Sequence, residues 1–502
     1  MMRYFIKSSS HLAVLLAACV MLSSPIISFG AGSPDEKPNI VFIFMDDMGY
    51  GDVQVLNPER CKIPTPHMDQ MAKEGMIFTD AHTSSSVCTP SRYSLMTGRY
   101  NWRTTKQGGV LNGFGKPLIP TERMTVASLL KGQGYNTAMI GKWHIGMNFP
   151  KGKGKQKVDW KGTITVGPYD VGFDYFFGIS GSLDMPPYIY IENNKFVGEA
   201  TVMKEPHPKR RGPAEPDFEV MNVLDELTEK SVEFIQRQNS EQPFFAYLSL
   251  PSPHTPIVPT PKWQGKSGLG AYGDFMMQTD DFVGTIVQAL DDAGFSKNTL
   301  LIVSSDNGCS YTQAGVAEME AQGHFPSAHY RGYKSDIWEG GHRVPFIVKW
   351  PAEVNAGTTS DATICLTDFM ATCAALTDAK LPANAAEDSV SFLPALEGKE
   401  IETSRKGIVH HTIKGHFAYR EGKWKLVLSK GSGGFKHKAI KGSPKGQLYD
   451  LEADPAETTN LFDSNPEVVE RLVAQLQAYV DQGRSTDGPK VPNDTNKIQI
   501  WK

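Results

Sequence analysis

The stretch that decides the fold is NIVFIFMDDMGYGD, residues 39–52. Residues 40–45 are all apolar, with β-branched and aromatic side chains, and such a run is typical of a strand buried inside a parallel sheet. Two adjacent carboxylates, Asp46 and Asp47, follow it directly. Because carboxylates beside a buried strand are costly without a cation, the pattern favours a hard metal ion bound through oxygen. A plain turn before Gly49 is the alternative interpretation.

A second predicted strand ends in the same way. The run TLLIVSSDNG, residues 299–308, places Asp306 and Asn307 directly after a β-rich segment. Carboxylate and amide oxygens suit Ca²⁺ or Mg²⁺, and ligands of parallel sheets bind beyond the carboxyl ends of the strands. The two strand ends can therefore converge on one ion, although an Asp-Asn-Gly turn is again the alternative.

Strand and helix patterns alternate along most of the chain. Beyond the first strand, further strands are expected at 76–81, 135–140, 244–250, 299–304 and 343–350, and helices at 65–75, 124–134, 224–239 and 275–294. This alternation predicts an α/β fold, with a mostly parallel sheet flanked by helices.

The pattern changes near residue 407. Residues 415–428 predict a β-hairpin that turns at Glu421-Gly422, a short strand follows at 447–451, and an amphipathic helix covers 468–481. We therefore expect a smaller carboxy-terminal antiparallel α+β subdomain. The expected organisation is a signal peptide at 1–30, a catalytic domain at 36–400 and this subdomain at 401–502.

The amino terminus narrows the cellular context. Two basic residues, an apolar core at 12–22 and small residues up to 31 form the three parts of a secretory signal peptide, which predicts a periplasmic or secreted protein. Leu-Ala-Ala-Cys before and at Cys19 resembles a lipobox, but the apolar run continues past it, so a lipid anchor is the less favoured alternative. No later segment reaches about 18 uninterrupted apolar residues, so no transmembrane segment is expected.

The charge balance argues against one class of partner. With 51 basic and 55 acidic residues, a net charge of −4, nothing indicates nucleic-acid binding.

The cysteines fit neither a disulfide framework nor a zinc site. The chain has six, and removal of the signal peptide leaves five, an odd number without any Cys-x-x-Cys pair. Cys88 therefore needs its own explanation. It opens the run CTPSRYSLMTGR, residues 88–99, for which a buried free cysteine in a loop is the simplest alternative.

This run resembles the Cys-x-Pro-Ser-Arg…Thr-Gly-Arg signature of the formylglycine-dependent type I sulfatases, with every fixed position present. Further blocks of that family follow in order, and the resemblance spans nearly the whole mature chain. They are GKWHIG at 141–146, SPHTP at 252–256, RGYK at 331–334, EGGHRVP at 339–345 and QLYDL at 447–451.

The resemblance implies an alkaline-phosphatase-like fold and a set of cofactors. It implies a Ca²⁺ ion held by Asp46, Asp47, Asp306 and Asn307, with the modified Cys88 completing the coordination shell. In that family a maturation enzyme, the formylglycine-generating system, converts the cysteine to formylglycine, and the hydrate of this aldehyde is the nucleophile.

The remaining roles follow from the resemblance together with the chemistry of a sulfate ester. Charge builds up on the sulfate oxygens in the transition state, and Arg92, Lys142 and Lys334 are suitable donors to stabilise it. Asp306 is the expected base for the nucleophile. An alkoxide leaves badly unless it is protonated, so His254, with Lys334 nearby, is the expected general acid for the leaving alcohol. His144 is expected to accept the proton that is lost as sulfate leaves.

Specificity is less well determined than reaction type. Export and the family resemblance favour a sulfated carbohydrate, and similarity to galactosamine-6-sulfatases suggests a 6-O-sulfated galactose or N-acetylgalactosamine attacked from the chain end. The basic loops at 151–161 and 204–211 can contact a polyanion or simply be solvated surface. Candidate substrate contacts are Asp184, His207, Arg211 and His342.

Two other functions are consistent with parts of the pattern. A phosphatase or phosphonate monoester hydrolase of the same superfamily can share the metal shell, and an inactive glycan-binding homologue can share the fold. The intact set of charged and nucleophilic residues favours an active sulfatase.

Overall fold

The computed structural model describes residues 37–154, 157–437, 439 and 441–502. The predicted signal peptide, with Cys19, lies outside the described residues. Among the described residues, no helix combines the length and the apolarity that a membrane span requires.

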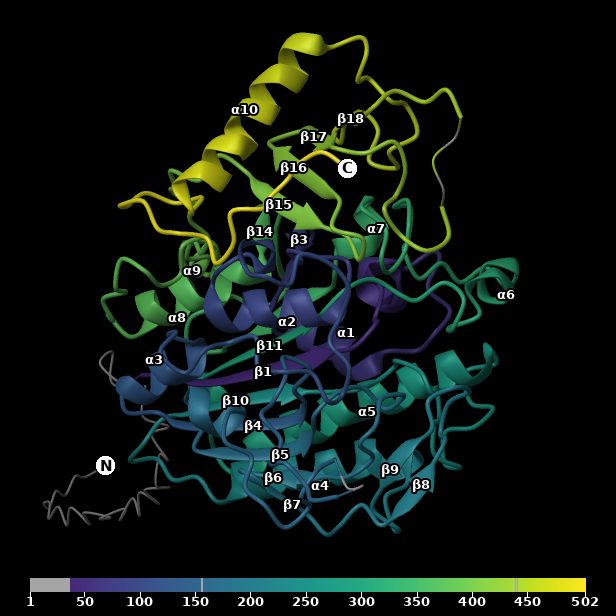
Figure 1. The fold of residues 1–502 in the computed structure, drawn as a ribbon, viewed down its shortest axis with the longest axis vertical. Helices are drawn as coiled ribbons and strands as arrows, with labels where there is room; N and C mark the ends of the chain where they lie inside the picture. Colours follow the sequence, from purple (N-terminus) through teal and green to yellow (C-terminus); the bar gives the residue numbers. More distant parts are fainter. Residues whose placement is uncertain (1–36, 155–156, 438, 440) are drawn as a thin grey trace, which may run out of the picture. The chain divides into compact units, whose positions relative to one another are not determined.

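The predicted first strand, β1 (Asn39–Met45), lies in the middle of a large sheet and pairs in parallel with β10 (Phe244–Ser249) and β11 (Thr299–Ser305). The order across the sheet is β13 (Thr358–Ser360), β2 (Met76–Phe78), β12 (Phe346–Lys349), β11, β1, β10, β4 (Asn136–Lys142), β5 (Tyr175–Ile179), β6 (Ile191–Glu192) and β7 (Lys195–Phe196) (Figure 1).

The centre of this sheet is parallel, and antiparallel pairs occur toward both margins. The strands β11, β1, β10, β4 and β5 are parallel to one another, and at one margin β13 pairs in parallel with β2. β12, which was expected only as one more strand, runs antiparallel to both β11 and β2, and β6 and β7 also pair antiparallel. The predicted mostly parallel sheet is confirmed.

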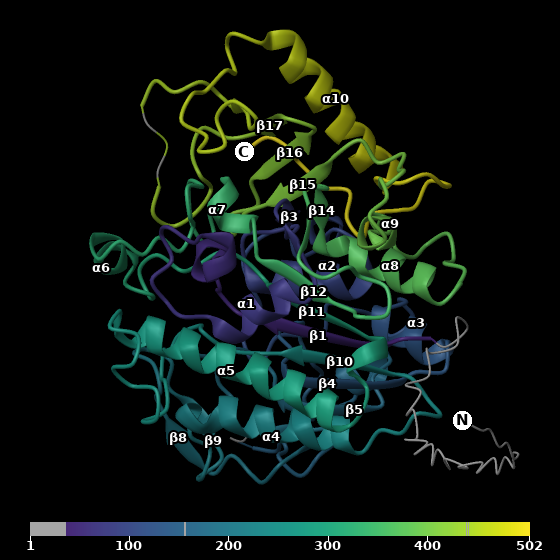
Figure 2. The same cartoon turned by 180° about the vertical axis from the view of Figure 1, so that it is seen from behind.

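Helices cover both faces of the sheet, and β1 shows why. Successive side chains of a strand point to opposite faces, and the consecutive residues Phe42 and Ile43 are fully buried in two different hydrophobic layers. Each fully buried side chain of this size stabilises the fold by about 1.5–3 kcal/mol. One layer contains α2 (Cys88–Thr97), α3 (Val126–Gly132) and α8 (Phe369–Leu376), and the other contains α1 (Pro66–Lys73), α4 (Val223–Gln236) and α5 (Gly270–Asp292) (Figures 1 and 2).

All the predicted helices form, with ends that differ by a few residues; α5 begins at Gly270, five residues before its predicted start. Helix α2 was not predicted. All ten of its residues are buried, so it has no polar face and no amphipathic period that would reveal a helix in the sequence.

The carboxy-terminal part contains a separate antiparallel sheet of β15 (Ile408–His411), β16 (Phe417–Glu421), β17 (Trp424–Val427) and β18 (Gln447–Asp450). The predicted hairpin is the pair β16 and β17. It turns at Gly422, whose φ of 55° is readily available to glycine. The helix α10 (Pro466–Gln482) packs on this sheet through Leu472 and Leu476. The domain boundaries themselves stay a prediction.

Smaller elements complete the described chain. They are the strands β3 (Ala81–His82), β8 (Val202–Lys204), β9 (Gly212–Ala214) and β14 (Ile364–Cys365), and the helices α6 (Val316–Ala321), α7 (Glu339–His342) and α9 (Leu393–Leu396).

The carboxy-terminal sheet is tied to the segment that precedes Cys88. The backbone N–H of Ser86 donates to the carbonyl oxygen of His411 on β15 at 3.0 Å, and the Ser85 hydroxyl donates to the same oxygen at 2.8 Å. Residues more than 300 positions apart thus fix the start of α2.

Candidate functional site

Four oxygen-bearing side chains meet at the carboxyl ends of β1 and β11. The register pairs Met45 with Ser305, so the acids that follow the two strands leave the sheet side by side. The Asn307 amide donates to Asp47 Oδ1 at 2.7 Å, and the backbone N–H of Asp47 lies 3.2 Å from Asp306 Oδ1. Asp46, Asp47, Asp306 and Asn307 are all buried.

A left-handed turn at Asp47 directs these side chains. Its φ is 70°, a conformation that costs a non-glycine residue roughly 1–2 kcal/mol. The Tyr272 hydroxyl oxygen lies 3.2 Å from the Asp47 carbonyl oxygen, and the N–H of Met48 donates to Ser305 Oγ at 3.0 Å. The turn alternative and the metal-ligand interpretation are therefore compatible.

Cys88 begins helix α2 beside this cluster. Its Sγ and one carboxylate oxygen each of Asp46 and Asp306 lie within 4.8 Å of one another. Burial raises the pKa of the Cys88 thiol to about 11, so the unmodified side chain is a neutral thiol near pH 7. The amino-terminal end of a helix carries partial positive charge, which favours an anion at this position.

Three cationic side chains face the carboxylates. Arg92 lies one turn after Cys88 on α2, and its Nη2 is 2.7 Å from Asp306 Oδ2. Lys142, at the end of β4, contacts Asp46. Lys334 Nζ lies 2.6 Å from Asp47 Oδ1. Three negative and three positive groups cancel in formal charge, so a bound divalent cation would leave the site positive and suited to an anionic ester.

The charges of this cluster depend on one another. Burial by itself would raise the pKa of Asp46, but His254 and Lys142 hold it well below its usual range. Burial and the neighbouring Asp46 carboxylate raise the pKa of Asp306. The nearby carboxylates, Asp47 foremost, overcome burial and raise the pKa of Lys334, which stays protonated.

The buried oxygen atoms fit a metal ion. Within the described chain, neither Asp46 Oδ1 nor Asn307 Oδ1 has a hydrogen-bond partner. A buried polar atom without a partner is costly, and a cation bound through oxygen would satisfy both atoms. The set of three carboxylates and one amide suits Ca²⁺ or Mg²⁺ rather than a soft metal.

Two histidines adjoin the cluster. His144 Nε2 lies 2.7 Å from the Leu111 carbonyl oxygen, which places the proton on Nε2 and leaves Nδ1 as a proton acceptor without a partner among the described residues. Burial, and then Lys142, lower the pKa of His144. His254 Nε2 lies 3.8 Å from Asp47 Oδ2, while its Nδ1 is 2.6 Å from the Thr255 carbonyl oxygen.

A cavity of about 240 Å³ opens onto Cys88, His254 and Lys334. Asp184, a predicted substrate contact, lines it and lies 3.5 Å from Arg210 Nε. Sequence reasoning missed several groups. Ser182, which bonds Lys142 at 2.7 Å, carried no signal, and Arg210 was visible only as part of a basic loop; the other missed lining residues include Tyr311, Tyr333, Phe435 and Lys436.

Three expected substrate contacts lie outside the lining of this cavity, and their roles stay predictions. His207 and Arg211 do not line the cavity in the described structure; their loop presents Arg210 instead, and His207 Nδ1 lies 3.2 Å from the neighbouring Pro208 carbonyl oxygen. His342 is fully buried, with its ring stacked 3.7 Å from that of His410 and its Nε2 3.0 Å from Lys425 Nζ. In this structure His342 is therefore part of a buried polar cluster.

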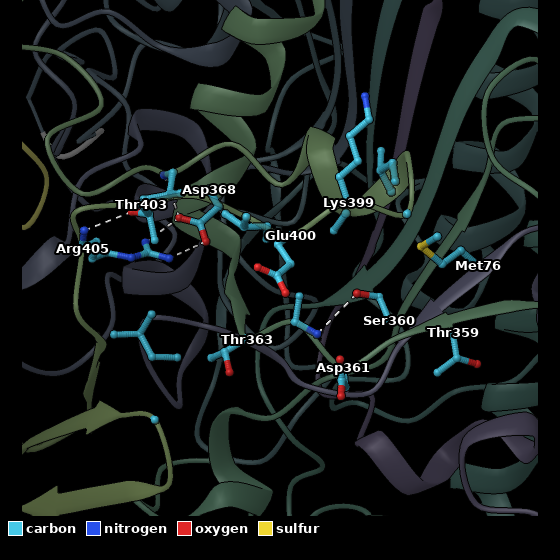
Figure 3. Close-up of a pocket in the computed structure, with 18 of the residues that line it drawn as sticks. Met76, Thr359, Ser360, Asp361, Thr363, Asp368, Lys399, Glu400, Thr403 and Arg405 are labelled. Atoms are coloured by element: carbon cyan, nitrogen blue, oxygen red, sulfur yellow. Dashed lines mark hydrogen bonds and ion pairs between the residues drawn. The ribbon is translucent and has the colours of Figure 1, made fainter.

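A larger cavity, of about 690 Å³, lies beside β13 (Figure 3). Threonine, serine and charged side chains from residues 358–363 and 398–406 form much of its lining. On its wall Asp368 and Arg405 are ion-paired at 2.6 Å. None of the predicted site residues in the described ranges lines it, so it lies apart from the site around Cys88.

Comparison with known proteins agrees with this geometry. The sulfatase family model matches residues 38–379, and a model for the carboxy-terminal region of N-sulphoglucosamine sulphohydrolase matches residues 332–485. The chain is 34% identical to an N-acetylgalactosamine-6-O-sulfatase of Bacteroides thetaiotaomicron over 94% of this chain and 99% of that protein. It is 32% identical to human arylsulfatase A over 92% and 93% of the two chains.

Three solved structures with a similar fold illustrate the likeness. One from work on glycosaminoglycan metabolism by Bacteroides thetaiotaomicron is 34% identical, with a TM-score of 0.77 over 88% of this chain and 99% of that one. Another, Ps i-CgsB in complex with k-i-k-neocarrahexaose, is 26% identical, with a TM-score of 0.68 over 92% and 96%. A phosphonate monoester hydrolase of Agrobacterium radiobacter, at 18% identity and a TM-score of 0.57, shares the fold.

The fold is thus alkaline-phosphatase-like, with a mostly parallel sheet flanked by helices and a small antiparallel sheet. Within that class the chain belongs to the sulfatase family, as its motifs predicted. It is an enzyme that hydrolyses sulfuric esters.

Proposed function

We propose that this sulfatase removes sulfate from sulfated glycans, acting at a chain end on 6-O-sulfated galactose or N-acetylgalactosamine. The 34% identity to an N-acetylgalactosamine-6-O-sulfatase along almost the full length of both proteins supports this substrate. The observation that carries the reaction type is the convergence of Cys88 with Asp46 and Asp306 at the floor of a cavity that also presents His254 and Lys334.

Two groups complete the site in this proposal. Asp46, Asp47, Asp306 and Asn307 hold Ca²⁺, and Cys88 is converted to formylglycine by a maturation enzyme. Together they supply a hydrated aldehyde oxygen of lowered pKa as the nucleophile toward sulfur. The unpartnered oxygens of Asp46 and Asn307 support the metal, and the neutral, buried thiol of Cys88 is a poor nucleophile without conversion.

The cationic side chains bind and orient the ester. Lys334 lines the cavity, and Arg92 and Lys142 are paired with the Asp306 and Asp46 carboxylates beside Cys88. In this proposal the three cations neutralise the charge that grows on the sulfate oxygens. Because all three are already held by buried carboxylates, they need little reorganisation when the substrate arrives.

Three groups move protons in this proposal. Asp306 accepts the proton of the nucleophile, and burial and Asp46 raise its pKa toward the range of a general base. His254 must first take up a second proton at Nε2, against the effect of burial, which lowers its pKa. It then donates that proton to the leaving oxygen of the sugar, while its Nδ1–H stays bonded to the Thr255 carbonyl oxygen. His144 accepts a proton at Nδ1, the nitrogen that Leu111 leaves free.

The test is sulfate release from a panel of defined sugars. We expect turnover of 6-O-sulfated N-acetylgalactosamine or galactose, much weaker turnover of their 4-O-sulfated isomers, and preference for nitrophenyl sulfate over nitrophenyl phosphate. Mass spectrometry of the tryptic peptide containing residue 88 checks the conversion. Cys88→Ala should abolish release; release that persists in this variant would contradict the assigned nucleophile.

Export to the periplasm or beyond belongs to the same proposal. It rests on the amino-terminal sequence pattern and fits a polymeric substrate that cannot enter a cell.

A further inference from the structure

An aromatic side chain at the mouth of the cavity is unusually exposed. Phe435 lies in the connection between β17 and β18, and 67% of its surface is accessible. It lines the cavity together with Lys436 and Tyr311. A single exposed phenyl ring is no sign of function in itself, but this one lines the cavity that also contains Cys88 and Lys334, so it can contact a bound substrate.

The backbone on both sides of this ring is anchored. The N–H of Phe435 lies 3.2 Å from Ser335 Oγ, directly after Lys334, and the Lys414 ammonium donates to the Gly434 carbonyl oxygen at 2.6 Å. His437 Nδ1 lies 3.0 Å from Asp336 Oδ2. The ring is therefore presented at a defined place on the rim.

A glycine makes this anchoring possible. A Cβ atom at Gly434 would lie 2.2 Å from Asp336 Oδ1 and 2.9 Å from Ser335 Oγ. A side chain at this position would have to displace the ends of the Asp336 and Ser335 side chains, so glycine favours the close approach of the loop to the segment that carries Lys334. The position of Phe435 relative to the reacting groups follows from this close approach.

Lys436 adds positive charge beside the ring. Its Nζ lies 2.9 Å from the centroid of the Tyr311 ring, which in turn packs edge-on against Tyr333 at 4.9 Å between centroids. The rim thus combines an open phenyl face, which suits the C–H face of a pyranose, with a cation that suits a carboxylate or sulfate.

The size of the cavity indicates what reaches this rim. A volume of about 240 Å³ lies below the roughly 300–1,000 Å³ of sites that enclose drug-sized ligands. A single sulfated sugar occupies the floor, so the next sugar of a longer substrate must pass over the rim.

We propose that Phe435 and Lys436 form a second sugar subsite, which binds the residue next to the sulfated one in an anionic oligosaccharide. This inference rests on the proposed glycan substrate. Phe435 stacks on the neighbouring sugar ring, and Lys436 pairs with its carboxylate or sulfate. The enzyme then prefers oligosaccharides to the isolated sulfated monosaccharide.

The test compares kcat/KM for a sulfated monosaccharide with that for the corresponding anionic disaccharide. Phe435→Ala should lower the disaccharide value between about three- and tenfold, the range expected for one aromatic contact, and leave the monosaccharide value nearly unchanged. Phe435→Tyr keeps the ring and should retain the preference. Tyr169→Ala, at another exposed aromatic residue (45% accessible) outside the cavity lining, is the matched control.

Lys436→Gln tests the charge separately. We expect it to weaken turnover of disaccharides whose second sugar is anionic and to spare those with a neutral second sugar. An equal loss on monosaccharide and disaccharide in Phe435→Ala, or no loss on either, would overturn the subsite.

A binding measurement separates this inference from the proposed function. If the wild-type enzyme releases no sulfate from any glycan, the proposed function fails. Calorimetric titration with the unsulfated anionic disaccharide still tests the rim, because weaker binding to Phe435→Ala than to wild type supports the subsite and equal binding contradicts it.

Discussion

The surroundings of Cys88 support its proposed conversion to formylglycine. Burial raises the pKa of the thiol to about 11, so the thiolate is scarce near pH 7, although Lys142 and Lys334 act in the opposite direction. The residue that the family signature marks as the nucleophile is thus inert as a plain cysteine. Its neighbours instead suit an oxygen nucleophile beside a hard cation.

Asp52 is a second residue whose role comes from its contacts. Its carboxylate accepts the N–H of Gly49 at 2.7 Å and the Tyr272 hydroxyl at 2.5 Å, and it lies 2.9 Å from His324 Nε2. Because the same hydroxyl oxygen lies 3.2 Å from the Asp47 carbonyl oxygen, Asp52 positions the left-handed turn that carries the proposed metal ligands.

We therefore expect Asp52→Asn to weaken calcium binding by about 10- to 100-fold, the range known for groups that orient metal ligands. Calcium titration by calorimetry, with kcat/KM measured at low and high calcium, checks this. Asp280→Asn is the control, since Asp280 is also a buried carboxylate and accepts two backbone N–H groups, from His67 and Met68, at the start of α1. Unchanged calcium affinity in Asp52→Asn would contradict the positioning role.

At the scale of elements, α2 and β15 show how the site is assembled. Helix α2 carries Cys88 and Arg92 one turn apart, so a single rigid element sets their separation. Strand β15 fixes the start of that helix through the His411 carbonyl oxygen. The carboxy-terminal sheet thus takes part in positioning the candidate nucleophile.

His411 predicts a pH dependence of stability. Burial, and then Lys502 and His416, lower its pKa to about 3, whereas an unfolded histidine titrates near 6.5. Below pH 6.5 the unfolded state binds a proton that the folded state does not, so stability falls as the pH falls. Between pH 6.5 and 5 this one residue accounts for about 2 kcal/mol of that loss.

His411→Phe should remove this part of the slope. The measurement is the free energy of unfolding in urea at pH 5 and pH 7 for both proteins. His207→Gln changes a partly exposed histidine and should leave the slope as it is. Equal slopes for wild type and His411→Phe would show that His411 does not supply the effect.

At the scale of the whole molecule, buried ion pairs join the carboxy-terminal sheet to the α/β part. Arg420 on β16 forms two contacts of 2.7 Å with Asp80, which precedes β3. Asp80 also pairs with Arg343 at 2.7 Å. Burial would raise the pKa of Asp80, but Arg343 and His82 hold it well below its usual range, so it stays charged.

Removing Arg420 takes two charge-assisted hydrogen bonds from the buried Asp80 carboxylate and leaves Arg343 as its arginine partner. Arg420→Ala should therefore lower the free energy of unfolding by about 1.5–3 kcal/mol, measured by urea denaturation at pH 7. Lys399→Ala breaks an exposed pair with Glu397 and should have little effect. A loss in Arg420→Ala no larger than that in Lys399→Ala would contradict this view of the interface.

Metal removal also acts on the whole molecule. If Ca²⁺ binds the four buried oxygen ligands, a concentration of about 100 times its dissociation constant stabilises the folded state by about 2.7 kcal/mol. We expect the melting temperature to fall in a chelator and to recover on addition of calcium. Asp46→Asn should make the melting temperature insensitive to the chelator. A melting temperature that never responds to calcium would argue against the metal.

Much of the architecture could be predicted because its signals lie within short, continuous stretches of sequence. The apolar run before Asp46 and the β-rich run before Asp306 identify buried strands, and the carboxylates that follow them identify the edge where the site lies. The hairpin at Gly422 is equally local, since the turn residue and the alternating strands are adjacent in the chain. The family signature at Cys88 needed only twelve consecutive residues.

Tertiary structure alone decided the rest, because it depends on contacts between distant residues. No pattern reveals that α2 is a helix buried on every side, that β12 runs antiparallel, or that His342 lies among other buried histidines rather than in the cavity. The pairing of Lys334 with Asp47 and the placement of Phe435 at the rim join segments hundreds of residues apart. Periodicity and side-chain chemistry can be recognised within a few consecutive residues. Which distant residue pairs with a charged group, and which ring stays exposed, depends on how the whole chain packs.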